Sequence, residues 1–193
     1  MIFVPSILAF GVIVAAYVNL GAKLATLRHD GVLKRIRTTP LPAGAYLSGV
    51  LGSTAATTLA ITGCTAVIGW LAFGALPRAA GLAEIAGGLA LGVVCFGSLG
   101  LALSSVARSA ESASPIANAS YLPVAIMSGI FDPTFSVPRW LSAVVGLLPV
   151  RALAQILQHG YTPVARAPLT DLLVLAGWAV AGCAFAAWRF RWH

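Results

Sequence analysis

Long apolar runs without charge are the feature of this sequence that most limits how it can fold. The segments from Ile2 to Leu20 and from Ala45 to Phe73 hold no charged residue. A helix needs about 20 predominantly apolar residues to cross a bilayer. Charged residues make up only 9% of the chain, against roughly 25% in soluble domains, so a soluble fold would lack polar surface. We therefore predict an all-α polytopic membrane protein with one transmembrane domain over residues 1–193.

Five apolar segments predict about five transmembrane helices. They cover about residues 2–20, 45–73, 85–106, 115–131 and 172–188. Another apolar stretch, 137–157, is interrupted by Pro138, Arg139, Pro149 and Arg151. This interruption indicates an outer re-entrant or interfacial pair of short helices over about residues 132–157 rather than a further span.

Lysine and arginine residues divide unequally between the two alternating sets of loops. Cytoplasmic loops of membrane proteins carry the excess of positive charge. Eight of the twelve Lys and Arg fall in one set and four in the other, so we predict a multi-pass protein of the cell membrane with a cytoplasmic C-terminus. The cytoplasmic set is Lys23, Arg28, Lys34, Arg35, Arg37, Arg108, Arg189 and Arg191, and the outer set is Arg78, Arg139, Arg151 and Arg166.

Residues 28–42 predict a short basic amphipathic helix between the first two spans. At about 100° per residue, its apolar and basic side chains fall on opposite sides. Asp30 is suited to cap its start, and Pro40 ends it. Such a helix faces lipid headgroups or a protein, and the plain alternative is a solvated basic loop. The apolar set is Val32, Leu33 and Ile36, and the basic set is Lys34, Arg35 and Arg37.

Several classes of function find no support in the residues. The net charge of +7 comes without a basic face interleaved with aromatic residues, so nucleic acid is not an expected partner. No GxxxxGK[ST] loop occurs, so any ATP is bound by another polypeptide. Cys64, Cys95 and Cys183 lie singly in predicted spans, without the spacing of a metal site. We therefore expect no catalytic residue, cofactor or metal in this chain.

Polar residues inside the predicted spans are few, and no acidic residue lies at mid-depth. Ionisable residues inside a membrane mark ion and proton pathways. The pathway is therefore expected to be apolar, with Asn19, Asn118 and Ser128 as its candidate polar residues. Such a surface suits a lipophilic or amphipathic cargo better than an ion.

Small residues recur at the spacing that lets helices approach closely in lipid. Gly49, Ser53 and Thr57 share one face of the second predicted span, and Gly88 and Gly92 share a face of the third. This pattern favours a tight bundle or a dimer of two copies.

Two parts of the chain resemble signatures of ABC exporter permeases of the ABC-2 family. Residues 28–42 (RHDGVLKRIRTTPLP) resemble the loop after that family's second span. Residues 127–133 (MSGIFDP), then 137–141 (VPRWL) and 148–150 (LPV), resemble its SGxxxP…P.WL…NP signature, with Leu148 in place of the usual Asn. The resemblance covers nearly the whole chain and is to the daunorubicin-type antibiotic-export permeases in particular.

The resemblance implies a non-enzymatic, six-span permease half that pairs with a second copy and with separate ABC ATPase subunits. The segment from Met1 to Leu20 matches the family's second span, so the family's first span has no counterpart here. The basic helix would dock on the ATPase and transmit its motion. Residues 132–157 would gate the outer end of the pathway, the alternative being an interfacial loop. At helical spacing, the buried stripe of this gate would be Val137, Trp140, Leu141, Val144 and Leu148.

Two hypotheses about function follow. The chain is either the membrane subunit of an ATP-driven exporter of lipophilic or amphipathic compounds, or a truncated or regulatory membrane module that binds a partner without transporting. Family members of this kind also export lipids and glycans, and no residue here separates those cargoes.

Overall fold

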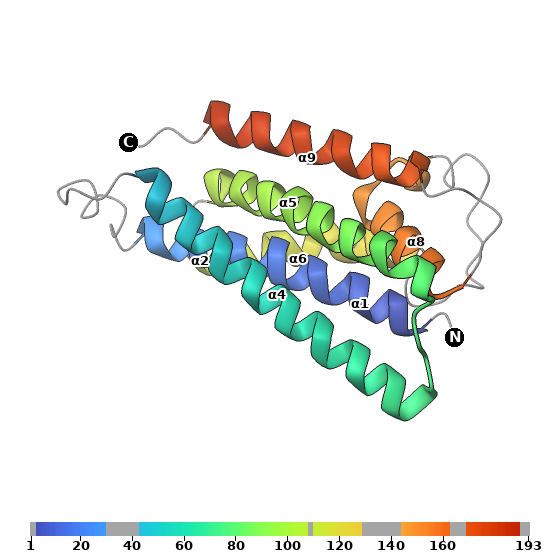
Figure 1. Cartoon of the computed structure of the whole chain (residues 1–193). Coiled ribbons are helices and arrows are strands. Elements are labelled where there is room, and N and C mark those ends of the chain that lie inside the picture. The colour runs from blue at the N-terminus through green and yellow to red at the C-terminus, as the bar shows by residue number, and fades with distance from the viewer. Residues whose placement is uncertain (1–2, 30–42, 108–109, 129–143, 163–168, 190–193) are drawn as a thin grey trace.

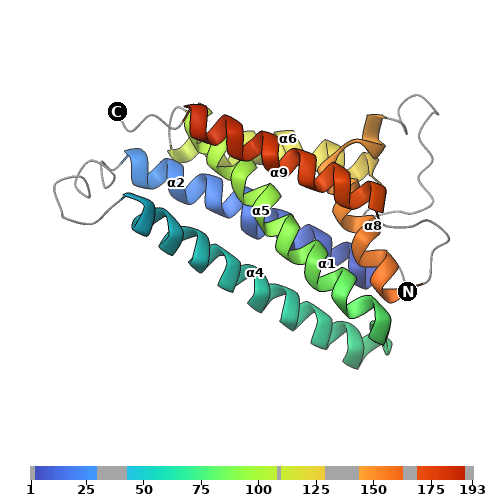
Figure 2. The same ribbon diagram turned by 45° about the horizontal axis from the view of Figure 1, so that its top comes forward.

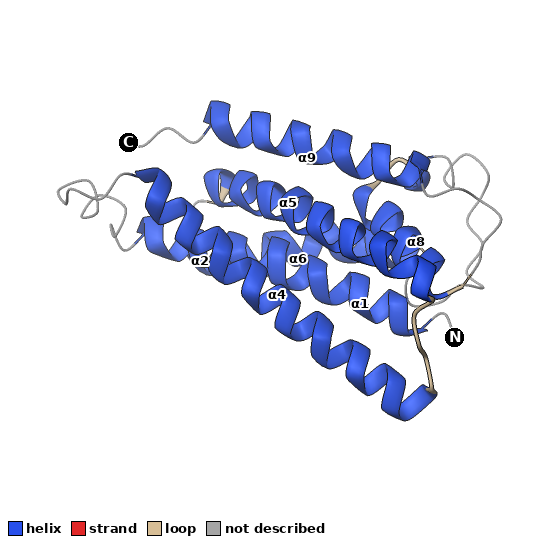
Figure 3. Ribbon diagram, viewed as in Figure 1, coloured by secondary structure: helices blue, strands red, loops and turns tan. Residues whose placement is uncertain are grey.

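The chain folds into a bundle of helices. The computed structural model describes residues 3–29, 43–107, 110–128, 144–162 and 169–189, and over these residues it contains no strand (Figure 3). The predicted all-α class is confirmed. In chain order the elements are α1 (Phe3–Ile13), η1 (Val14–Asn19), α2 (Leu20–His29), α4 (Ala43–Phe73), η2 (Ala79–Gly81), α5 (Leu82–Val106), α6 (Ala110–Met127), α8 (Pro149–Tyr161) and α9 (Leu169–Arg189).

Helix α5 lies at the centre of the arrangement. It packs along α9 and also contacts α1, α2 and α8, whereas α4 packs chiefly on α1 (Figures 1 and 2). The end of α2, the start of α4 and the end of α9 lie at one end of the bundle, and the start of α1, the end of α4 and α8 lie at the other (Figure 1). These helix ends thus fall into the two sets that the sequence predicted. Their assignment to the cytoplasm and the exterior stays a prediction from charge.

Four helical segments are long and apolar enough to cross a membrane. Among the described residues these are Phe3–Leu27, Gly49–Phe73, Ala79–Ser105 and Leu169–Ala186, which match the first, second, third and fifth predicted spans. The fourth, predicted over 115–131, is helix α6. It begins earlier, at Ala110, contains Pro115 and Pro123, and is not among the four. Its predicted end at residues 129–131 lies outside the described residues.

The first predicted span is longer than its sequence pattern indicated. Its helix continues past Leu20 to His29 and includes the π-helical segment η1. Lys23 ends the uncharged run but is exposed, while Leu24 is buried, so the helix keeps a packed face beyond the charge. Arg28, predicted in the basic connecting helix, therefore belongs to α2.

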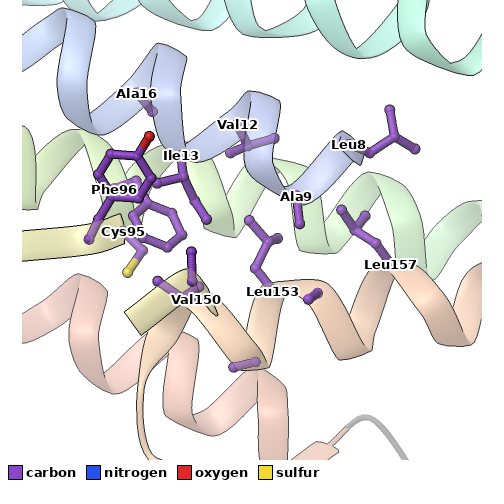
Figure 4. Close-up of a cluster of buried hydrophobic side chains, with 14 of the residues drawn as sticks. Leu8, Ala9, Val12, Ile13, Ala16, Cys95, Phe96, Val150, Leu153 and Leu157 are labelled. Carbon is purple, nitrogen blue, oxygen red and sulfur yellow. The ribbon is translucent and has the colours of Figure 1, made fainter. Parts of the chain in front are cut away.

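The largest buried cluster joins α1, α5 and α8. Leu153 and Leu157 of α8 lie against α1 side chains such as Ala9 and Val12 (Figure 4). On α5, a methyl group added at Gly88 would meet Ile156, and one at Gly92 would meet Leu153. The predicted close approach at these two glycines is confirmed, and it brings α8 into the core of the bundle.

The small-residue face of α4 is different. Gly49, Ser53 and Thr57 are exposed, and a methyl group added at Gly49 or Gly52 would meet no atom within 4 Å. This face is therefore not packed within the described part of the chain.

Candidate functional site

The predicted ATPase-coupling residues lie outside the part of the chain that the structure describes. They are Val32, Leu33, Lys34, Arg35, Ile36 and Arg37. The structure places the end of α2 and the start of α4, which flank them, at the same end of the bundle (Figure 1).

The predicted outer gate is described only in part. Val137, Trp140 and Leu141 lie outside the described residues. Val144 is 53% exposed and its neighbour Val145 is 1% exposed, so Val145 rather than Val144 packs on the rest of this chain, and the place of Val144 in the gate stays a prediction. Leu148 is half-buried.

The second half of the predicted gate is a helix, as expected for the second of the two short helices. This helix, α8, runs from Pro149 to Tyr161. Pro149 occupies the first turn, where a missing N–H costs no hydrogen bond. One face of α8 is buried in the core, which fixes its position against α1 and α5.

The three predicted pathway residues lie on η1, on α6 and in the turn that follows α6. Asn19, at the end of η1, and Asn118, on α6, are exposed, and Ser128 is half-buried with its hydroxyl donating to the Val124 carbonyl at 2.6 Å. None of the three lines the pocket described next.

A pocket of about 390 Å³ lies between η1, α5, α6, α9 and the start of α8. Its walls come from the middle parts of several predicted spans, and none of the described residues that line it is charged. The size falls within the range of small-molecule sites, roughly 300–1,000 Å³. The lining residues are Tyr17, Phe96, Leu99, Ala102, Leu103, Ser120, Tyr121, Val124, Leu148, Pro149, Val150, Trp178 and Phe185.

Two hydroxyl groups form the polar feature of the pocket wall. Tyr17 Oη lies 2.8 Å from Ser120 Oγ, which joins η1 to α6. Tyr121 packs edge-on against Tyr17, with ring centroids 6.4 Å apart and an interplanar angle of 84°. Edge-to-face contacts of this kind are favourable and directional. The hydroxyl of Tyr17 is thus held at a defined place in a largely apolar wall.

Trp178 fixes the opposite side of the pocket. Its indole Nε1 donates to the Leu147 carbonyl at 2.8 Å, so α9 is tied to the turn that precedes α8. The pocket is therefore bounded by one predicted gate residue, Leu148, and by a helix that is anchored to the gate segment.

Residues 1–161 match the model of the ABC-2 type transporter family. The chain belongs to this family. It is the membrane component of an ABC transporter, a multi-pass permease that is not itself catalytic. The match includes both signature segments, 28–42 and 127–150, so the family predicted from them is confirmed. No curated protein matches the chain.

The sequence of this permease did not identify Tyr17 and Ser120 as residues of a site. Serine and tyrosine inside apolar runs are ordinary packing residues, and only the fold shows that these two meet across 103 positions of the chain. The available signal was weak: a tyrosine in the interior of a predicted span, away from the interfaces where this residue is enriched. The described residues also hold no group of His, Cys, Asp or Glu suited to a metal ion.

Proposed function

We propose that this permease is the membrane subunit of an exporter in the plasma membrane. It moves lipophilic or amphipathic compounds outward, of the drug or antibiotic type, and is driven by a separate ATPase subunit. The observation that carries this proposal is the uncharged pocket between the spans, since its lining favours apolar over ionic cargo.

The positions of the helices that flank the two segments support different roles for them. The basic helix over 28–42 docks on the ATPase at the end of the bundle that holds the C-terminal end of α9, with Val32, Leu33 and Ile36 as its buried face. Motion there reaches the spans through α2 and α4, which flank the helix directly. The segment over 132–157 gates the opposite end.

A second copy of the permease completes the proposed assembly. The small-residue face of α4 supports a homodimer, because it is exposed in this chain and lets another helix approach closely.

Co-purification tests the proposal. The tagged permease, expressed with a candidate ABC ATPase subunit, should retain that ATPase in mild detergent, and the uncharged aglycone of daunorubicin should stimulate ATP hydrolysis by the purified complex. Failure to retain any ATPase would instead favour the regulatory membrane module.

A further inference from the structure

We propose that the pocket beside Tyr17 and Ser120 binds an uncharged aromatic ring system that carries one hydrogen-bond donor. The proposal rests on the proposed export function only in treating this ligand as cargo. The binding itself needs neither ATP nor a partner subunit.

The wall of the pocket favours a flat aromatic ligand. Five aromatic side chains line it, and they come from four different elements, η1, α5, α6 and α9. Offset-stacked and edge-to-face contacts with aromatic rings add to the gain from apolar burial. An acyl chain would gain the burial without these directional contacts. The five are Tyr17, Phe96, Tyr121, Trp178 and Phe185.

The hydroxyl pair defines which polar group the ligand carries. Ser120 Oγ donates its one proton to the Ala117 carbonyl at 2.7 Å. The proton between Ser120 and Tyr17 must therefore come from Tyr17, which leaves the Tyr17 oxygen with free lone pairs. The pocket wall thus offers an acceptor at this point, and the ligand group that matches it is a hydroxyl or an N–H.

The uncharged lining of the pocket disfavours ionic ligands. No described lining residue carries a charge, so an ion placed here would lose its hydration without gaining a counter-ion. Trp178 provides no donor to the ligand, because its N–H is already bonded to the Leu147 carbonyl.

Energy transfer from Trp178 measures this binding directly. The full chain, with its other four tryptophans changed to Phe, is placed in phosphatidylcholine nanodiscs and titrated with 1-pyrenemethanol, an uncharged aromatic alcohol. A matched protein that keeps only Trp70, on α4 and away from the pocket, reports partition of the probe into lipid. We expect saturable transfer from Trp178 and only linear, non-saturating transfer from Trp70.

Two variants separate the hydrogen bond from apolar burial. Tyr17→Phe should weaken binding of 1-pyrenemethanol about fivefold and leave binding of 1-methylpyrene, which lacks the hydroxyl, unchanged. Ser120→Ala frees the Tyr17 proton, so this variant should gain affinity for 1-acetylpyrene, which only accepts. Circular dichroism of each variant shows whether the helices are retained.

The proposal is overturned if transfer from Trp178 does not saturate, which would mean that lipid fills the pocket. It is also overturned if a folded Tyr17→Phe protein binds both probes as the parent does. Either result leaves ATPase association and transport to be judged separately, because no ATPase is present. Conversely, saturable binding in a permease that retains no ATPase would support the binding site and contradict the proposed export function.

Discussion

His159 Nδ1 lies 2.6 Å from Glu84 Oε2, and this pair joins the last turn of α8 to the first turn of α5. A carboxylate is favoured at a helix start and a histidinium at a helix end, so each partner also suits its own helix. Beside the pair, the Arg78 backbone N–H donates to the Gly160 carbonyl at 3.1 Å. The end of α8 is therefore clamped to the start of α5.

Removing this pair should loosen the clamp by a modest amount. The two side chains are 17% and 31% exposed, so water screens the interaction, and we expect Glu84→Gln to lower the free energy of unfolding by about 1 kcal/mol. The double variant Glu84→Gln with His159→Asn should lose less free energy of unfolding than the two single variants lose together. Thermal unfolding in detergent measures these losses. Glu111→Gln, at an exposed glutamate in the first turn of α6, is the control and should change little. Additive losses from the two changes would show that the pair is not coupled.

Helix α5 approaches the π-helical segment closely at Gly100. A Cβ at this position would lie 2.9 Å from the Ala16 carbonyl oxygen and 3.0 Å from that of Tyr17. Backbone atoms cannot move aside cheaply, so Gly100→Ala should destabilise the permease by about 1–3 kcal/mol and weaken probe binding near Tyr17.

Gly97→Ala on the same helix is the matched control. A Cβ there makes only ordinary contacts, 3.7 Å to Leu20 and 3.9 Å to Leu51, so this variant should be neutral or slightly stabilising. Unfolding curves for the two variants make the comparison. Equal stability would contradict the close approach of η1 and α5.

Helix positions could be predicted from apolar runs, but their ends and faces could not. The run ends at Lys23, yet the packed face continues to Leu24 because a lysine on the exposed side does not interrupt it. For the gate, helical spacing placed Val144 in the buried stripe, whereas the short turn before Pro149 buries Val145. Periodicity assumes one unbroken helix, and a turn at residues 147–148 breaks that assumption.

The candidate site, too, could be predicted only in part. Signature segments identified the family, because such motifs are local in sequence. The pocket depends on Tyr17 and Ser120, which come from separate helices, and no spacing within either helix indicates that they meet.

Neighbouring valines before α8 separate a folding role from a gating role. Val145→Asp should cost at least about 3 kcal/mol and reduce the amount of folded protein, because the new charge would be buried. Val144→Asp should leave the fold intact, because Val144 is exposed in this chain, and should impair export without releasing the ATPase. The yield of folded protein in detergent and the rate of transport are measured for both variants. If the Val144→Asp variant exports as well as the parent, Val144 is not a residue of the gate.

Single cysteines test the predicted orientation of the bundle. On a background without native cysteines, those replacing Thr38 and Arg108 should resist a membrane-impermeant thiol reagent in intact cells, and those replacing Arg78 and Arg166 should react. Permeabilised cells, in which Thr38 and Arg108 should also react, are the control. Reversed labelling would overturn the orientation inferred from the distribution of lysine and arginine.

ATP-driven accumulation of the uncharged aglycone of daunorubicin in inside-out proteoliposomes tests the exporter most directly. The permease reconstituted with its co-purified ATPase should concentrate the compound inside these vesicles when ATP is added outside.

The double variant Leu33→Asp with Ile36→Asp should insert into the membrane but lose both the ATPase and accumulation, because charge would replace the apolar anchors of the coupling helix. Arg35→Ala should weaken association only modestly, since single exposed charges contribute little. ATP hydrolysis by an intact complex that moves neither this aglycone nor any other lipophilic or amphipathic compound would contradict the account.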